Sequence, residues 1–262
     1  RIAQGFDDNY GAIVVYDREG KRVNSWGENY LKVPHSIWIS PNDEIFFTDT
    51  WDHVVRKYTT SGELLMTLGI PGMCGMPGGP FNMPTGVVQS SRGDIYVSDG
   101  YRQSRIHRFT AEGELLLSWG SGDLNDYEQT MHGSTATPGT GPGEFNLPHS
   151  VNVGADGRVY VMDRSNLRIQ VFDPDGNYLE EWTQVPSPNQ ATIDENDVMH
   201  VACAGEIQLW STTGSLIGSW GEKGDAPHQF RGAPHGISID SNGDVYIAQV
   251  GAKAALNKFA RI

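Results

Sequence analysis

The sequence repeats a unit of about 40 residues, which is the length of one four-stranded blade of a β-propeller. In 143–182 the unit predicts strands at 149–153, 158–162, 168–172 and 178–182. The same pattern covers 33–69, 82–120 and 185–221, whereas 233–262 carry the first three strands and 12–27 carry the last two. We therefore expect a single all-β domain over residues 1–262, a six-bladed β-propeller whose first blade is incomplete at the N-terminus.

Three alternate repeats begin their first strand with a Pro-His pair. The pairs are Pro34-His35, Pro148-His149 and Pro234-His235, and the repeats between them carry Pro84-Thr85 and Pro188-Asn189. Histidines in every second blade of a six-bladed ring would stand about 120° apart around one axis. Three neutral imidazoles with an open fourth position are the ligands of a catalytic zinc. The alternation therefore predicts a site for zinc or another divalent transition metal.

The topology of a blade predicts which loops lie beside these histidines. Strand direction alternates within a blade, so the start of the first strand shares a face with the loop between the second and third strands. Tyr101 and Arg164 lie in two such loops, and Arg1 lies in the corresponding segment of the first unit. A phenol can serve as a general acid or base, and a guanidinium can hold a substrate carboxylate. We therefore predict Tyr101, Arg164 and Arg1 as catalytic residues.

Two long connections between blades fall on the same face. Residues 70–81 are rich in Gly, Pro and Met, and 121–142 form a polar insert, both of which are typical of lids or binding loops. His132 lies in the second insert, and His53 lies in a loop that faces the predicted metal site. We expect these two histidines to contact substrate. The remaining histidines are predicted to be strand or surface residues: His107, His200 and His228.

Composition limits the partners and the compartment. The net charge of −13 argues against nucleic acid and anionic membranes, which both need a basic patch. It says little about small ligands, and the expected partner is a small-molecule substrate. No apolar run approaches the roughly 18 residues of a membrane span. Cys74 and Cys203 form neither a close-spaced metal pair nor a disulfide framework. We expect a cytoplasmic bacterial protein; the start at Arg1 leaves a secreted form open, and the oligomeric state is undetermined.

The Pro-His pairs, together with Asp99-Gly100-Tyr101 and Asp163-Arg164, resemble the peptidyl-α-hydroxyglycine α-amidating lyase family and its bacterial relatives. That family is built from NHL repeats and forms a six-bladed propeller. The resemblance implies a zinc on the axis held by three histidines, here His35, His149 and His235. It also implies that Tyr101 handles the substrate hydroxyl proton.

The resemblance further implies that Arg164, and Arg1 in the first-unit loop, lie near the substrate. It does not extend to the family's structural calcium. Gly236 stands where the family carries a carboxylate that helps to hold this calcium.

The resulting expectation is a zinc lyase that cleaves an N–C–OH centre of carbinolamide or hemiaminal type. The products would be a carbonyl compound and an amide or amine. Two alternatives stay open. A metal-dependent hydrolase would use the same three histidines to activate water. A non-enzymatic NHL-repeat interaction scaffold would bind partners and no metal.

Overall fold

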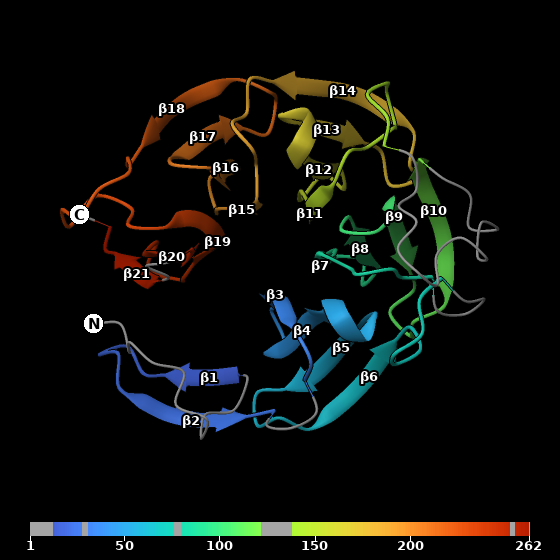
Figure 1. The fold of residues 1–262 in the computed structure, drawn as a ribbon, viewed down its shortest axis with the longest axis horizontal. Coiled ribbons are helices and arrows are strands. Elements are labelled where there is room, and N and C mark those ends of the chain that lie inside the picture. Colours follow the sequence, from blue (N-terminus) through green and yellow to red (C-terminus); the bar gives the residue numbers. More distant parts are fainter. Residues whose placement is uncertain (1–12, 28–30, 76–79, 122–137, 252–254, 262) are drawn as a thin grey trace.

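The structure is a computed structural model that describes residues 13–27, 31–75, 80–121, 138–251 and 255–261. Every strand in it belongs to an antiparallel sheet, and each sheet follows chain order from its inner to its outer strand. Figure 1 shows the sheets arranged as a ring around a central axis. No helix among these residues is long and apolar enough to cross a membrane.

Four sheets have four strands. The first contains β3 (Pro34–Ile39), β4 (Glu44–Asp49), β5 (Val54–Thr59) and β6 (Leu64–Leu68). The second contains β7 (Gly86–Gln89), β8 (Ile95–Asp99), β9 (Ser104–Phe109) and β10 (Leu115–Ser121). The third contains β11 (Pro148–Val153), β12 (Val159–Asp163), β13 (Arg168–Phe172) and β14 (Tyr178–Thr183). The fourth contains β15 (Gln190–Ile193), β16 (Val198–Ala202), β17 (Ile207–Ser211) and β18 (Leu216–Trp220).

Two further sheets are smaller. The fifth contains β19 (Ala233–Ile239), β20 (Val245–Val250) and β21 (Ala255–Phe259). A two-stranded sheet pairs β1 (Ile13–Tyr16) with β2 (Arg22–Trp26). In the part of the chain that the structure describes, the propeller therefore has five blades, and the expected count of six is corrected. Among the described residues, the hairpin β1–β2 is the part of the sixth unit that forms a sheet.

The core lies between neighbouring blades. One cluster of buried side chains joins Met162 and Ile169 of the third blade to Met199 and Trp210 of the fourth. Another joins residues of the second blade to Val161 of the third. The inner strands of a blade are covered on both faces, which is why β8 and β12 are continuous buried runs rather than alternating ones.

Tryptophans at the ends of the outer strands interlock successive blades. Gly214 lies at a turn with φ +91°, and a Cβ there would come within 2.6 Å of Trp182 Nε1 on the preceding blade. Gly62 is related in the same way to Trp26, whose ring would lie 2.9 Å from such an atom. The hairpin β1–β2 thus contacts the first blade as a complete blade contacts its neighbour.

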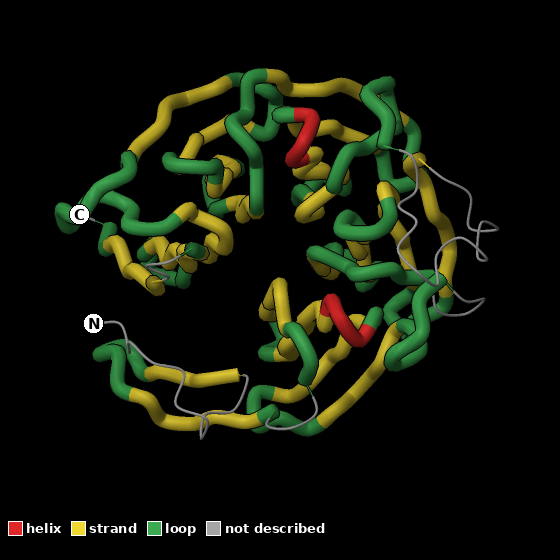
Figure 2. Tube along the Cα trace, viewed as in Figure 1, coloured by secondary structure: helices red, strands yellow, loops and turns green. Residues whose placement is uncertain are grey.

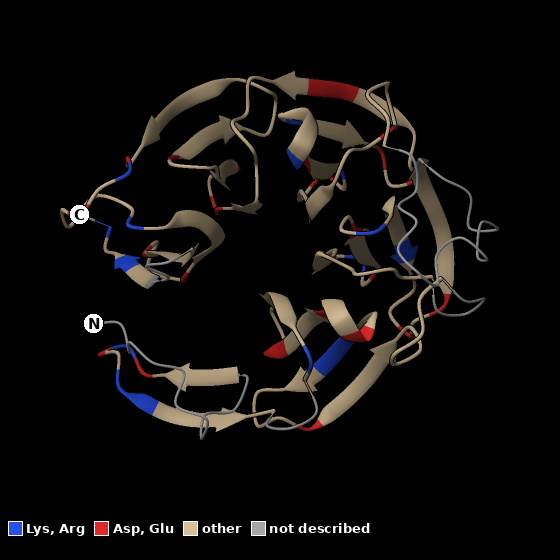
Figure 3. Cartoon of the chain, viewed as in Figure 1, with Lys and Arg blue, Asp and Glu red and all other residues tan. Residues whose placement is uncertain are grey.

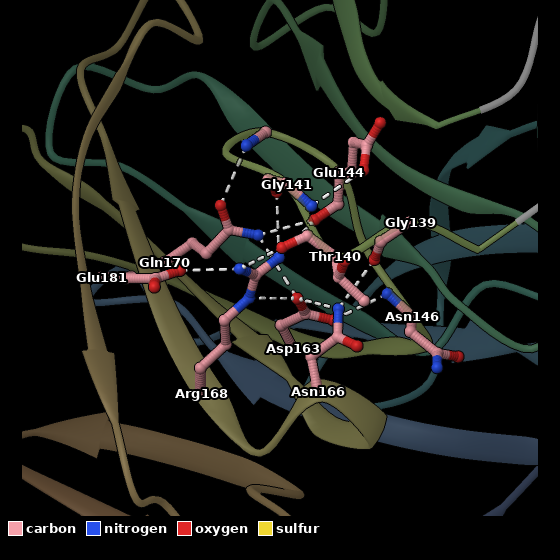
Figure 4. Close-up of polar contacts among 11 residues, drawn as sticks. Gly139, Thr140, Gly141, Glu144, Asn146, Asp163, Asn166, Arg168, Gln170 and Glu181 are labelled. Carbon is pink, nitrogen blue, oxygen red and sulfur yellow. Dashed lines mark hydrogen bonds and ion pairs between the residues drawn. The ribbon is translucent and has the colours of Figure 1, made fainter.

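Arg168 fixes the end of the long insert and the residues just after it to the third blade (Figure 4). Its Nε donates to Asp163 Oδ2 at 2.8 Å, and one Nη1 hydrogen reaches Glu181 Oε2 at 2.6 Å. The other hydrogens go to backbone carbonyls of Thr140, Gly141 and Glu144. All five donors of a guanidinium are therefore used, and the side chain is only 7% exposed.

Arg168→Lys is expected to lower the free energy of unfolding by about 3 kcal/mol, because an ammonium cannot satisfy this fork of acceptors and leaves buried groups unpaired. Urea denaturation measures the loss. Arg158→Lys in the same blade is the matched control, since Arg158 pairs with a half-exposed Asp156 and surface pairs contribute about 0–1 kcal/mol. Equal losses in the two variants would contradict the anchoring role.

Charged residues of both signs are interspersed around the ring (Figure 3). Two short 3-10 helices connect second and third strands: η1 (Thr50–Asp52) in the first blade and η2 (Arg164–Asn166) in the third. Figure 2 shows both helices on the inner part of the ring. Of the loops predicted to share a face with the histidines, the two that contain these helices therefore lie on the inner part of the ring.

Candidate metal centre and active site

Each Pro-His pair sits at an irregularity in the pairing of an inner strand. Register shifts follow Pro34 in β3, Pro148 in β11 and Pro234 in β19. The intervening inner strands β7 and β15 pair with their neighbours without a shift. A bulge turns a side chain away from the regular alternation of a strand. Among the described inner strands, only the three that carry these histidines show such a shift.

The three bulges direct three imidazoles toward one point. The ring centroids of His35 and His149 are 4.9 Å apart, those of His35 and His235 are 5.0 Å apart, and those of His149 and His235 are 4.6 Å apart. The ring planes cross at 72° to 89°. One ligand nitrogen from each residue lies within 4.8 Å of the other two, a spacing suited to a single metal ion.

Backbone carbonyls select the tautomer of two of these rings. His35 Nδ1 donates to the Thr85 carbonyl at 2.8 Å, and His149 Nδ1 donates to the Asn189 carbonyl at 2.7 Å. A carbonyl only accepts, so each neutral ring carries its proton on Nδ1 and keeps the Nε2 lone pair available. This is the arrangement that orients metal-bound histidines in proteins.

The surroundings keep the three rings neutral. Burial is the main cause in each case: it lowers the pKa of His35, lowers that of His149 well below its ordinary value, and lowers that of His235 to about 4. The positive charge of Arg164 lowers all three pKa values further. Neutral imidazoles are the form that binds metal.

Carboxylates at the ends of second strands hold the segments that lead to the histidines. Asp49 Oδ1 accepts from the Val33 backbone N–H at 2.9 Å, and Asp163 Oδ1 accepts from that of Asn146 at 2.8 Å. Gln249 Oε1 does the same for Gly232 at 2.7 Å. These buried residues were not singled out from the sequence as positioning groups, although the recurrence of Asp after a buried strand was a visible signal.

Tyr101 lies against the histidine cluster, as predicted. Its hydroxyl is 2.8 Å from His35 Nε2 and 3.1 Å from His149 Nε2. The single phenol proton can be donated to only one of these nitrogens at a time. Burial raises the pKa of Tyr101, and the charge and hydrogen bond of Arg164 oppose this effect. The phenol is therefore protonated at neutral pH and sits beside the point where the three rings converge.

Arg164 also lies at the cluster. It begins η2, and its charge acts on Tyr101 and on all three histidines. Its Nη1 donates to Asn189 Oδ1 at 3.4 Å. The structure thus brings together five of the predicted residues: His35, His149, His235, Tyr101 and Arg164.

Of the other predicted site residues, only His53 is described, and it lies outside this cluster. His53 is the residue after η1, and its Nδ1 accepts from the backbone N–H of Met83 at 3.1 Å. Burial lowers its pKa. Arg1 and His132 lie outside the described residues, as does most of the 121–142 insert. His107 and His200 are strand residues, in β9 and β16, as predicted.

The axis next to the cluster is lined by neutral polar groups. Ser36, Ser150 and Gln190 line a small cavity beside the three histidines. A Cβ added at Gly236 would lie 3.2 Å from Gln190 Oε1, which itself accepts from the backbone N–H of Ile237 at 3.0 Å. An amide therefore adjoins Gly236, where the resemblance implies a carboxylate for calcium.

A larger cavity lies away from the histidines. It measures about 590 Å³, lies between the fourth and fifth blades, and is lined in part by Trp220 and Phe259. Its carboxylates are used within their own turns: Asp194 and Asp240 accept backbone N–H groups two and four residues further along the chain. The convergence of ionisable groups therefore favours the histidine cluster as the functional site.

Comparison with known families finds the NHL repeat over residues 81–109 and 145–172. Human NHL repeat-containing protein 3 is 32% identical over 266 residues, which is 94% of this chain and 72% of that protein. Peptidyl-α-hydroxyglycine α-amidating lyase 1 of Drosophila melanogaster is 30% identical over 157 residues, which is 58% of this chain and 27% of that protein. The homology to amidating lyases expected from the motifs is confirmed.

Among solved structures, a streptogramin B lyase has a TM-score of 0.60 at 15% identity and covers 95% of this chain and 76% of its own. A virginiamycin B lyase of Staphylococcus aureus has a TM-score of 0.57 at 14% identity and covers 88% of this chain and 71% of its own. At this level of identity the similarity concerns the fold, which is an all-β propeller in each case.

Proposed function

Because the chain belongs to the NHL-repeat family that includes NHL repeat-containing protein 3, and is homologous to amidating lyases, we propose that it is a metal-dependent lyase. Its substrate is a small molecule with an N–C–OH centre. The observation that carries the proposal is the convergence of three neutral imidazoles on one point, with a phenol in contact with two of them.

The chemistry of the donors fits a divalent transition metal, preferably zinc. His35, His149 and His235 would hold it through one nitrogen each, which leaves a further position for substrate or water. A metal bound there supplies Lewis-acid activation of a hydroxyl group. Among the described residues, those that line the axis beside the histidines are Ser, Thr, Asn and Gln, with no carboxylate to compete for this position.

Tyr101 is suited to move the proton that the reaction must transfer. Cleavage of an N–C–OH centre removes the hydroxyl proton, forms the carbonyl bond, breaks the C–N bond and protonates the departing nitrogen. A neutral phenol can give its proton to that nitrogen and receive the hydroxyl proton at the same oxygen. The net change is a proton moved from oxygen to nitrogen, and Tyr101 ends as it began.

Arg164 supplies a fixed positive charge next to the reacting centre. It would pair with a carboxylate on the substrate through a charge-assisted hydrogen bond. Nη1 is directed to Asn189 and the guanidinium also hydrogen-bonds Tyr101. A guanidinium has five N–H donors, so others remain for such a contact. The products of a carboxylate-bearing substrate would be a glyoxylate-like acid and an amide.

Arg164→Ala is expected to raise KM about 10- to 100-fold for an N-acyl-α-hydroxyglycine, because a hydrogen bond to a charged group contributes about 1.5–3 kcal/mol. For the same substrate with its carboxylate converted to a carboxamide, Arg164→Ala should change KM little. Steady-state kinetics on both substrates measure the difference. An equal loss on the two would contradict a carboxylate-binding role.

The reaction is tested by incubating the zinc-loaded protein with an N-acyl-α-hydroxyglycine in ¹⁸O-labelled water. A lyase leaves the acyl group as an amide without label, and treatment with a chelator stops the reaction until zinc is restored. A hydrolase would release the acyl group as an acid that carries label. Absence of turnover together with absence of bound metal would favour an interaction scaffold and contradict the proposal.

We further propose that the hairpin β1–β2 is the outer half of a sixth blade. Trp26 packs on Tyr58 of the first blade, with ring centroids 5.0 Å apart. Its relation to Gly62 matches that of Trp182 to Gly214 between two complete blades. In a ring of six, the first, third and fifth blades are equally spaced, which suits three ligands around one axis.

A further inference from the structure

Asn189 stands in a blade that contributes no imidazole to the cluster, yet it contacts three residues of the site. Its backbone carbonyl accepts from His149 Nδ1 at 2.7 Å. Its side-chain Nδ2 donates to the carbonyl of Pro234, the residue before His235, at 2.8 Å. Its Oδ1 accepts from Arg164 Nη1 at 3.4 Å. The residue is only 6% exposed, so these contacts are largely shielded from solvent.

Thr85 occupies the same place in the second blade and makes two of the three contacts. Its carbonyl accepts from His35 Nδ1 at 2.8 Å, and its hydroxyl donates to the Pro148 carbonyl, just before His149, at 2.8 Å. Each blade between two histidines therefore fixes the ring of one histidine and the backbone before the next. The acceptor for an arginine is the feature that distinguishes Asn189 from Thr85.

We propose that Asn189 is a positioning residue that couples the histidine cluster to the substrate-binding arginine. Through its amide nitrogen it holds the strand that presents His235, and through its amide oxygen it holds the guanidinium of Arg164. The two functions reside in two atoms of one planar amide, so the arginine is kept at a fixed distance from the metal ligands. This inference rests on the proposed function.

Two substitutions test the roles of the amide nitrogen and the amide oxygen of Asn189 separately. Asn189→Thr keeps a donor for Pro234, as Thr85 has for Pro148, and removes the amide oxygen that holds Arg164. Asn189→Asp keeps an acceptor for Arg164 and removes the donor for Pro234. Asn196→Thr is the matched control, because Asn196 lies exposed in the turn between β15 and β16, at the other end of the same blade.

Two probes report on the two atoms. Cobalt(II) affinity, from its absorption spectrum in competition with a chelator, reports on the histidines. The change that glyoxylate causes in that spectrum reports on the arginine.

We expect Asn189→Thr to change cobalt affinity less than 3-fold and to weaken glyoxylate binding about 10-fold, as Arg164→Ala does. The variant that combines both substitutions should show no further loss of glyoxylate binding. Asn189→Asp should weaken cobalt binding about 10-fold, as loss of an outer-shell partner does. Parallel losses on both probes in both variants would overturn the proposal.

A metal-free measurement separates this inference from the proposed function. NMR relaxation of the Arg164 guanidinium in chelator-treated protein should show a rigid group in the wild type, in Asn189→Asp and in Asn196→Thr, and a mobile one in Asn189→Thr. A wild type that binds no cobalt but shows this pattern would refute the metal site and retain the positioning role. A guanidinium equally rigid in all variants would overturn the role of Asn189, whatever the metal result.

Discussion

His149→Ala is expected to abolish metal binding, from about one equivalent of zinc per chain to less than a tenth. His149 is the most buried of the three histidines, at 2% exposure, and its ring contacts both of the others. Two remaining imidazoles would bind a divalent ion far more weakly than three, since structural and catalytic zinc sites use at least three protein ligands. Elemental analysis of the purified, zinc-reconstituted protein measures the effect.

His200→Ala serves as the control for this substitution. His200 is also a partly buried strand histidine, but it pairs with Asp194 in the fourth blade. The His200→Ala variant should retain a full equivalent of zinc. Metal retained by His149→Ala would refute the three-histidine site, and metal lost by both variants would point to unfolding rather than to a lost ligand.

Tyr101→Phe is expected to lower kcat about 10²- to 10⁴-fold while the zinc content stays at one equivalent. The substitution removes only the hydroxyl that lies within hydrogen-bonding distance of His35 and His149, and general acid–base groups contribute rate factors of this size. Steady-state kinetics and elemental analysis on the same sample give the two quantities.

Tyr246→Phe makes the same chemical change away from the cluster, where the hydroxyl donates to Asp240 in the fifth blade. It should leave kcat within about 2-fold, as expected for a side chain that contacts no reacting group. Wild-type turnover by Tyr101→Phe would exclude the tyrosine from proton transfer. Loss of zinc in Tyr101→Phe would instead assign it a structural part in the metal site.

The repeat made much of the site predictable. Pro-His at the same point of alternate units was sufficient to bring His35, His149 and His235 to the axis. The alternation of strand direction was sufficient to bring Tyr101 and Arg164 to the same end of the ring. Both inferences depend on local pattern and on topology, which a sequence expresses directly.

Other features depend on pairing between distant segments. The bulges after Pro34, Pro148 and Pro234 arise from the register of each inner strand with its neighbour, which no single strand specifies. The role of Asn189 was not anticipated, because its three partners lie in the third and fifth blades and not in its own. The blade count of six was wrong for the described chain, since the incomplete first unit was counted as a blade of the ring and only its two outer strands are described.

The bulges and the carbonyl contacts have a consequence for how the ring stays closed. The three histidines come from the first, third and fifth blades. An ion held by all of them would therefore cross-link segments that are far apart in the chain. Its binding energy would add to the resistance of the ring to opening, by about 4 kcal/mol at a concentration 1,000 times its dissociation constant. Removal of the metal would then lower the stability of the propeller as well as abolish the proposed chemistry.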